Sequence, residues 1–151
     1  MHVRYLMHRE VVTLQASDSL DLAEGIMRLG RIRHLPVVAG EHVVGILSQR
    51  DLFRAAISSV LGMQGDAERA WLATIPVKHV MTVPVFTVPP WVPLRQAVQI
   101  MIDKRIGCLP VVEESGKLVG LLSESDCLVH LAHVLDVAEE KALLPELPPT
   151  A

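Results

Sequence analysis

An internal repeat constrains the fold of this chain more than any other feature of its 151 residues. When the sequence is shifted by 74 positions, residues 7–38 align with residues 81–112, and one inserted residue then continues the alignment from residues 42–51 to residues 117–126. The two copies share 18 identities over 42 aligned positions, which is far above chance. The chain therefore contains two similar units of about fifty residues, and each alone would have only a small core.

The apolar pattern predicts the same order of elements in both copies, β-α-β-β-α. Apolar residues at helical spacing indicate the first helix of each copy: Leu20, Ala23, Ile26, Met27 and Leu94, Ala97, Ile100, Met101. Short aliphatic runs predict the strands: 11–14, 35–38, 43–47 in the first copy and 85–88, 109–112, 118–122 in the second. A second helix opens at Ser48 and at Ser123.

These elements predict an α+β fold in which the two repeats pack as a pseudo-twofold pair, since packing them face to face buries more apolar surface. The expected divisions are a first repeat at 5–60, a helical connector at 61–76, a second repeat at 77–135 and a C-terminal tail at 136–151. A break at residues 62–66 is expected to precede a helix that carries Trp71, and the chain is expected to be frayed from Leu144 onward.

Composition excludes several classes of protein. Half of the residues are hydrophobic but only 3% are aromatic, and the longest apolar runs are shorter than the ~20 residues that a membrane span needs. The N-terminus lacks the apolar region of a signal peptide, so a cytoplasmic location is expected. The net charge of −3 argues against a nucleic-acid partner. Cys108 and Cys127 lack the spacing of a zinc or redox pair, so reduced thiols are expected.

One short pattern occurs at the strand-to-helix junction of both copies, as GILSQRD at residues 45–51 and as GLLSESD at residues 120–126. A Ser followed three residues later by an acid is typical of a capping box, which satisfies the free N–H groups of the first helical turn. The same groups can bind a ligand, because a helix start suits a phosphate and a carboxylate can accept both hydroxyls of a ribose. Both interpretations stay open, since a carboxylate has two oxygens.

With these motifs the chain resembles a pair of cystathionine-β-synthase (CBS) domains, also called a Bateman module, over residues 5–135. The likeness is carried by RHLPVV at 33–38 with GILSQRD, and by GCLPVV at 107–112 with GLLSESD. The resemblance implies a non-catalytic sensor of adenosine-containing ligands (AMP, ADP, ATP or S-adenosylmethionine), which requires no cofactor. It also implies a homodimer through helices 53–61 and 127–135, and a regulated partner protein.

Carried over by position, the resemblance also implies roles for individual residues in two related clefts. These residues would hold ribose hydroxyls (Asp51, Asp126), touch ribose or phosphate (Ser48, Ser123), line the clefts (Thr13, Thr87), meet the adenine edge through their backbone (His34, Cys108) or pack beside adenine (Pro36, Pro110). Because rings are scarce, adenine is expected to lie between aliphatic side chains such as Val11, Ile46, Val85 and Leu121 rather than on an aromatic ring.

The two copies differ inside the motif. Arg50 can pair with a phosphate through two hydrogen bonds, whereas its counterpart is Ser125, beside the negative charge of Glu124. We therefore expect the first cleft to bind phosphorylated adenosine better than the second. The alternative is that Arg50 is a solvated helix residue.

Three other functions compete with this interpretation. Cys127, His130 and His133 share a helical stretch, but no nearby Asp or Cys completes a zinc ligand set, so no metal site is expected. Ser48 and Asp51 have no His at a repeat-matched position, so no catalytic site is expected. The main rival function is a structural or protein-interaction module whose clefts bind no nucleotide.

Overall fold

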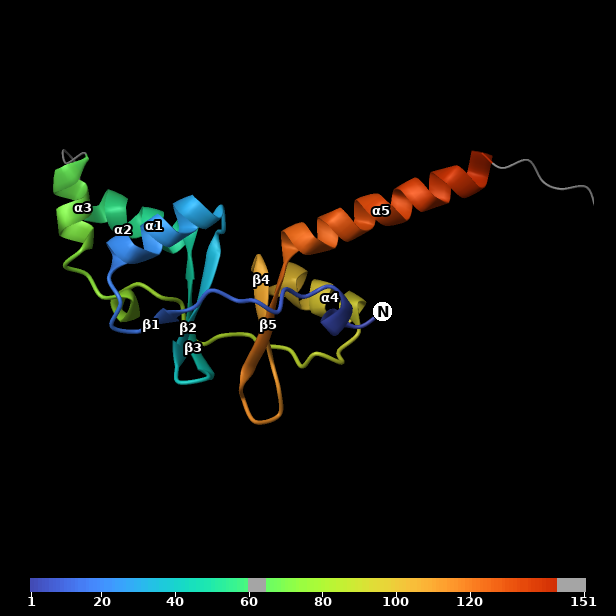
Figure 1. Cartoon of the computed structure of the whole chain (residues 1–151), viewed down its shortest axis with the longest axis horizontal. Helices are drawn as coiled ribbons and strands as arrows, with labels where there is room; N and C mark the ends of the chain where they lie inside the picture. The colour runs from blue at the N-terminus through green and yellow to red at the C-terminus, as the bar shows by residue number, and fades with distance from the viewer. Residues whose placement is uncertain (60–64, 144–151) are drawn as a thin grey trace, which may run out of the picture.

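The computed structural model describes residues 1–59 and 65–143, which form two similar halves side by side (Figure 1). The first copy contributes η1 (Val3–Tyr5), β1 (Leu14–Gln15), α1 (Leu20–Gly30), β2 (His34–Ala39), β3 (His42–Ser48) and α2 (Gln49–Ser59), where η denotes a 3-10 helix, and α3 (Asp66–Leu72) lies in the expected connector. The second copy contributes η2 (Val77–His79), α4 (Leu94–Lys104), β4 (Cys108–Val112), β5 (Leu118–Ser123) and α5 (Glu124–Leu143). This order confirms the predicted α+β class.

The two sheets are built on matching hairpins. β2 and β3 are antiparallel, with Leu35 opposite Leu47, and β1 joins β2 as a short parallel strand. β4 and β5 form the second hairpin, in which Leu109 lies opposite Leu122. These four leucines are fully buried, so each hairpin supplies the central apolar side chains of its own core.

The first strand of each copy is shorter than the sequence pattern predicts. In the stretch 11–14, the ladder with β2 begins only at Leu14. In the stretch 85–88, Val88 alone forms a bridge, to Val111. The two prolines that follow Val88 lack the N–H donors that a longer ladder requires, so pairing ends there.

The opening segments of the two copies are exchanged between the halves. Val3 and Met7, at the start of the first copy, are buried in the core that contains Leu109 and Leu122. Val77, which opens the second copy, is fully buried in the core of the first. The divisions proposed at 5–60 and 77–135 follow the chain, whereas the cores cross them, so neither half completes its core without the other.

Two glycines of the repeated motif make room for this exchange. A Cβ atom added at Gly45 would collide with the Met81 side chain, and one added at Gly120 would collide with the side chain of Met7. Met7 and Met81 are themselves a repeat-matched pair. A larger residue at Gly45 would push the Met81 side chain aside, and one at Gly120 would also crowd the backbone carbonyl of His8 at 3.0 Å.

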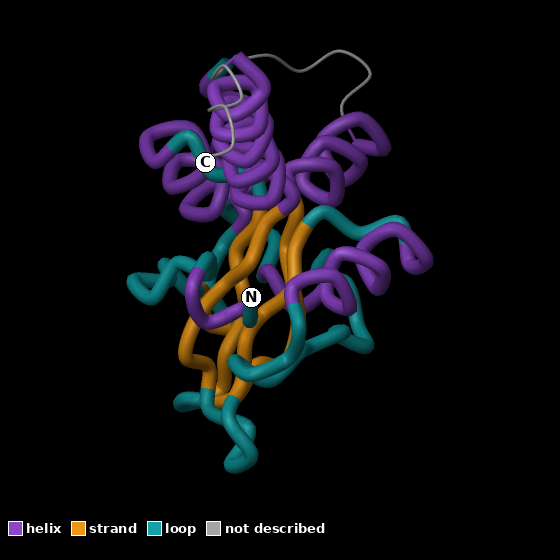
Figure 2. Tube along the Cα trace, turned by 90° about the vertical axis from the view of Figure 1, so that its right-hand side faces the viewer, coloured by secondary structure: helices purple, strands orange, loops and turns teal. Residues whose placement is uncertain are grey.

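Most of the helices gather at one end of the strands, and the hairpin turns lie at the other (Figure 2). The α3 helix carries Trp71 as expected, and the predicted break at 62–66 falls largely on residues outside the described part. α5 runs through Leu143 and projects past the body of the protein (Figure 1), while the frayed segment expected from Leu144 lies outside the described residues. In residues 1–59 and 65–143, no helix is both long and apolar enough to cross a bilayer.

Candidate functional site

A cleft of about 1330 Å³ lies between the two copies, somewhat larger than the ~300–1,000 Å³ of typical small-molecule sites. Its first-copy wall includes Arg33, His34, Ile46, Ser48, Arg50 and Asp51. Its second-copy wall includes Thr82, Val85, Phe86, Arg105, Cys108 and Pro110. The start of α2 therefore faces residues of the opposite copy across a space that can hold a small molecule.

Ser48 and Asp51 form a capping box at the start of α2. The Oδ2 atom of Asp51 accepts hydrogen bonds from the Ser48 N–H at 2.9 Å and from the Ser48 hydroxyl at 2.8 Å. In return, the Asp51 N–H donates to Ser48 Oγ at 3.1 Å. The capping interpretation of the motif is thus confirmed for the first copy, and the cap fixes the Asp51 carboxylate in one orientation.

The second oxygen of Asp51 is left for other partners. The Thr82 hydroxyl lies 3.4 Å from Oδ1 and 3.3 Å from Oδ2, distances at the long end for an O–H···O hydrogen bond. Thr82 reaches this position because its backbone pairs with Ile46, with N···O distances of 2.7 and 3.1 Å. A ligand hydroxyl could displace so weak a contact and donate a hydrogen bond to Oδ1 in its place.

Positive charge surrounds this carboxylate. The cleft is lined by four arginines, Arg33, Arg50, Arg54 and Arg105, against the two carboxylates Asp51 and Glu124. One of the arginines already crosses between the copies, since Arg33 donates to the Ser125 hydroxyl at 3.1 Å and lies 3.8 Å from Glu124. In a chain whose net charge is −3, this local excess of arginine marks the cleft as a place for an anion.

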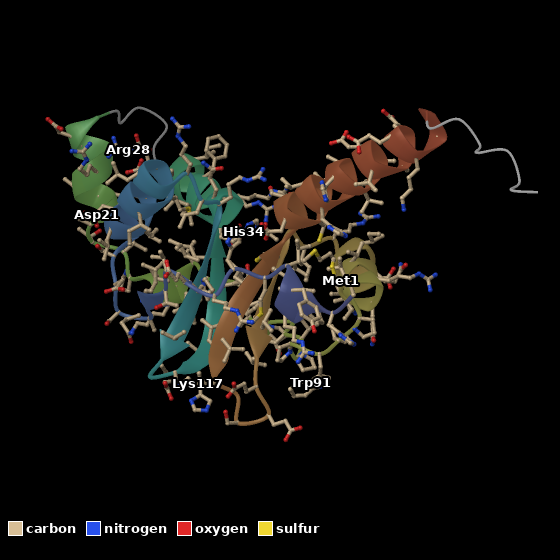
Figure 3. The ribbon with its side chains drawn as sticks, turned by 45° about the vertical axis from the view of Figure 1, so that its right-hand side comes forward. Met1, Asp21, Arg28, His34, Trp91 and Lys117 are labelled. Atoms are coloured by element: carbon tan, nitrogen blue, oxygen red, sulfur yellow. The ribbon has the colours of Figure 1, made fainter. Side chains whose placement is uncertain are left out.

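The two residues expected at the adenine edge lie in the same cleft and are neutral. Burial, followed by the charge of Arg33, lowers the pKa of His34, which lies near the middle of the molecule (Figure 3). Burial, followed by the charge of Glu124, raises the pKa of the Cys108 thiol to about 12. Neither side chain therefore adds a charge where the backbone of these two residues is expected to meet the adenine edge.

The second motif repeats the capping box at the start of α5. The Oδ2 atom of Asp126 accepts from the Ser123 N–H at 2.8 Å and from the Ser123 hydroxyl at 2.6 Å. Its Oδ1 atom, however, lies 2.7 Å from His8 Nε2. Both oxygens of this carboxylate are therefore occupied, unlike those of Asp51.

The large cleft brings together only part of the residues named from the sequence. Those that line it are His34, Ser48, Arg50, Asp51, Cys108 and Pro110, whereas Thr13, Pro36, Thr87, Ser123 and Asp126 do not. Of the aliphatic side chains expected around adenine, Ile46 and Val85 line the cleft and Val11 and Leu121 do not. The residues that the sequence reasoning missed are Arg54, Thr82, Phe86 and Arg105.

One of these omissions has a physical explanation. Thr82 lies one residue after a repeat-matched Met, in a segment whose exchange between the halves was not anticipated. Phe86 and Phe53 also line the cleft, so it is not purely aliphatic as expected, and the Lys104 ammonium lies 5.0 Å from the Phe86 ring centroid. Among the described residues, no group of three or more His, Cys, Asp or Glu side chains is placed to hold a metal ion.

Comparison with known proteins connects this geometry to a family. A family model of the CBS domain matches residues 3–58 and 77–133. The chain is 34% identical over 136 residues to an inosine-5′-monophosphate dehydrogenase of Korarchaeum cryptofilum, covering 90% of this chain but 25% of that protein. It is 30% identical over 135 residues to a CBS domain-containing protein of Dictyostelium discoideum, covering 89% of this chain and 93% of that protein.

Solved structures share the architecture. A protein of Vibrio cholerae named for acetoin utilization (AcuB) matches with a TM-score of 0.75 and 33% identity, covering 93% of this chain and 96% of that one. A CBS domain pair solved with 5′-methylthioadenosine and S-adenosyl-L-methionine matches with a TM-score of 0.74 and 21% identity, covering 87% and 99%. The protein CBSX2, solved with AMP, matches with a TM-score of 0.72 and 21% identity, covering 88% and 97%. The last two likenesses concern the fold.

Proposed function

The chain belongs to the CBS domain family, and from that premise we propose that it is a non-catalytic regulatory module that binds an adenosine-containing ligand between its repeats. The observation that carries the proposal is the state of Asp51, whose Oδ2 caps α2 while Oδ1 has only a long contact with Thr82 among the described residues. A carboxylate held in this orientation can accept hydrogen bonds from ribose hydroxyls without reorienting. In this proposal Ser48 touches the ribose, and His34 and Cys108 meet the adenine edge.

The charge of the cleft favours a phosphorylated ligand such as AMP, ADP or ATP. Four arginines line it against two carboxylates, and guanidinium groups bind phosphate oxygens through paired hydrogen bonds. S-adenosylmethionine, which carries a positive sulfonium, would gain less from these arginines. Structural relatives have been solved with both kinds of ligand, with AMP and with S-adenosyl-L-methionine, so the fold accommodates either.

The signal is proposed to be a shift between two packings of the repeats. A ligand that contacts both copies stabilises the packing in which those contacts are best, and this changes the surface that the helices offer. α2 and α5 expose large apolar side chains, including Phe53, Ile57, Leu128 and Leu131. We place a homodimer interface on these side chains, and a regulated protein would bind next to it or compete for it.

The proposal also includes the absence of catalytic activity and a cytoplasmic location. The chain covers only 25% of the dehydrogenase relative, so the match gives no reason to assign this chain that protein's reaction. Cys108 and Cys127 are both unpaired, which fits the reducing cytoplasm.

A thermal-shift panel tests the proposal. AMP, ADP, ATP, S-adenosylmethionine and GTP are each added to the wild type and to the Asp51→Ala/Asp126→Ala variant. At a ligand concentration about a hundredfold above Kd, the wild type should gain roughly 2.7 kcal/mol of stability. We expect stabilisation by the adenine nucleotides, little by GTP, and none in the double variant. Absence of stabilisation by every adenosine compound would favour the rival function, a protein-interaction module without nucleotide.

A further inference from the structure

The N-terminal segment supplies a side chain that occupies the Asp126 oxygen not used by the cap of α5. His8 Nε2 lies 2.7 Å from Asp126 Oδ1, a short hydrogen bond to a charged acceptor. The His8 side chain is 70% exposed, whereas that of Asp126 is 13% exposed. His8 therefore contacts Asp126 from the solvent side, at the oxygen that matches Asp51 Oδ1 in the first motif.

Thr82 holds the equivalent place in the first motif, which makes the comparison between the two copies direct. Thr82 and Ile46 exchange two backbone hydrogen bonds, and His8 and Leu121 exchange the same two, both at 2.9 Å. Thr82 is 74 positions after His8, which is the repeat offset. The backbone around the two motifs is thus the same, and the side chain at this position differs.

That difference changes how tightly each carboxylate is held. The Thr82 hydroxyl contacts Asp51 at 3.3–3.4 Å, whereas His8 contacts Asp126 at 2.7 Å. Hydrogen bonds weaken at the longer distance and strengthen when a charged group takes part. A ribose can therefore take the place of Thr82 at little cost, but it must break a short bond to displace His8.

Building on the proposed function, we propose that His8 is an intramolecular competitor of ribose, which makes the Asp126 motif a second, weaker site than the Asp51 motif. Ligand fills the Asp51 site first. The Asp126 site fills only when the His8 side chain swings away, which its exposure permits. One residue of the N-terminal segment thus sets the order in which the two sites respond to ligand concentration.

The test exchanges the two side chains. His8→Thr places the residue of the first copy in the second, and Thr82→His is the matched reverse exchange. AMP binding is measured by isothermal titration calorimetry on the full chain. To isolate each site, His8→Thr is combined with Asp51→Ala, and Thr82→His with Asp126→Ala.

In the Asp51→Ala background, His8→Thr should strengthen AMP binding at the remaining site about tenfold or more, because a charge-assisted hydrogen bond no longer opposes it. In the Asp126→Ala background, Thr82→His should weaken binding by a similar factor. Unchanged affinity after both exchanges, in a wild type that does bind AMP, would overturn the role of His8 and leave the proposed function standing. A wild type that binds no adenosine compound would overturn both.

A His8→Ala variant guards against an effect of the new threonine itself. It removes the imidazole without adding a hydroxyl, and because His8 is largely exposed the fold should tolerate it. If His8→Ala strengthens the second site as His8→Thr does, the imidazole is the competitor. If only His8→Thr has an effect, the competitor role is wrong and the hydroxyl of the new side chain is responsible.

Discussion

Asp51 is proposed to serve two purposes through two different oxygens, and an Asp51→Asn variant separates them. The amide oxygen of asparagine can replace Oδ2 and accept the bonds from the Ser48 N–H and hydroxyl, at 2.9 and 2.8 Å in the present structure. The amide NH₂ then replaces Oδ1 and presents a donor where a ribose hydroxyl needs an acceptor. The cap should survive, and ligand binding should not.

The magnitudes follow from these contacts. Losing the negative charge near the start of α2 should cost about 0.3–1 kcal/mol, whereas Asp51→Ala, which also removes the capping acceptor, should cost about 1–2 kcal/mol. For a chain of this length each kcal/mol lowers Tm by about 2–4 °C. Losing hydrogen bonds from ribose to a charged acceptor should cost about 1.5–3 kcal/mol of binding free energy, or roughly 10- to 150-fold in Kd.

Differential scanning fluorimetry with and without AMP reads both effects from one sample. At about a hundred times the wild-type Kd, AMP should raise the wild-type Tm by roughly 5–11 °C. If Asp51→Asn weakens binding a hundredfold, the remaining stabilisation is about 0.4 kcal/mol, so the shift should fall to about 1–2 °C. Asp126→Asn is the matched control, because it alters the same capping box in the other copy.

The control should lose a similar amount of Tm without ligand and keep most of the AMP shift, since Asp126 is already occupied by His8. If Asp51→Asn retained the full AMP shift, Oδ1 would not hold the ribose. Equal losses of the AMP shift in the two variants would contradict a ligand contact that Asp51 makes and Asp126 does not.

Three further predictions concern stability, pH and charge. Val77→Ala and Val3→Ala should each lower the free energy of unfolding by about 1.5–3 kcal/mol, because each valine is fully buried in the opposite half. Urea unfolding followed by circular dichroism should show a single transition. Two transitions would show that the halves unfold separately. Because the pKa of His34 is lowered in the folded state, the unfolded chain takes up the proton first, and the free energy of unfolding should fall as the pH drops below about 6.5. His34→Gln should make this dependence on pH less steep. An identical dependence in the variant would contradict the prediction. Arg50→Ala should weaken AMP more than adenosine in calorimetry, by about tenfold, and equal loss for both would place Arg50 away from the phosphate.

The sequence determined much of this fold, because repeat identities fix which elements are equivalent. The hairpins and both capping boxes were predictable from strand runs and from the Ser-to-Asp spacing. The exchange of opening segments was not, because a short apolar segment such as the one around Val3 or Val77 fits either of two equivalent cores, and the alignment treats both choices alike. The same ambiguity hid Thr82, which joins the cleft only because its segment crosses to the other half.

Helix ends show a different limit. Arg31 and Arg105, which match in the repeat, adopt left-handed conformations with φ of 52° and 54° after α1 and α4. Glycine is the usual residue at a left-handed helix end. Because arginine holds that position here, the placement of glycines in the sequence could not locate the ends of these two helices. Arg105 lines the cleft at this turn, so a residue in the unfavourable left-handed conformation lies in the proposed ligand site.

The placement of the proposed site at helix starts also suggests how a ligand could be sensed at a distance. Arg33 bridges from the first copy to the start of α5, where it contacts Ser125 and lies 3.8 Å from Glu124. Both charged side chains are about half exposed, at 55% and 54%, so this pair contributes little to stability and a phosphate can compete for Arg33 at small cost. Such competition would remove this inter-repeat contact at the start of α5, and α5 is one of the two helices that expose the apolar side chains of the proposed interface. Binding in the cleft and rearrangement of that surface would then be coupled through one weak inter-repeat contact, and the coupling would be lost if Arg33 were replaced by an uncharged residue.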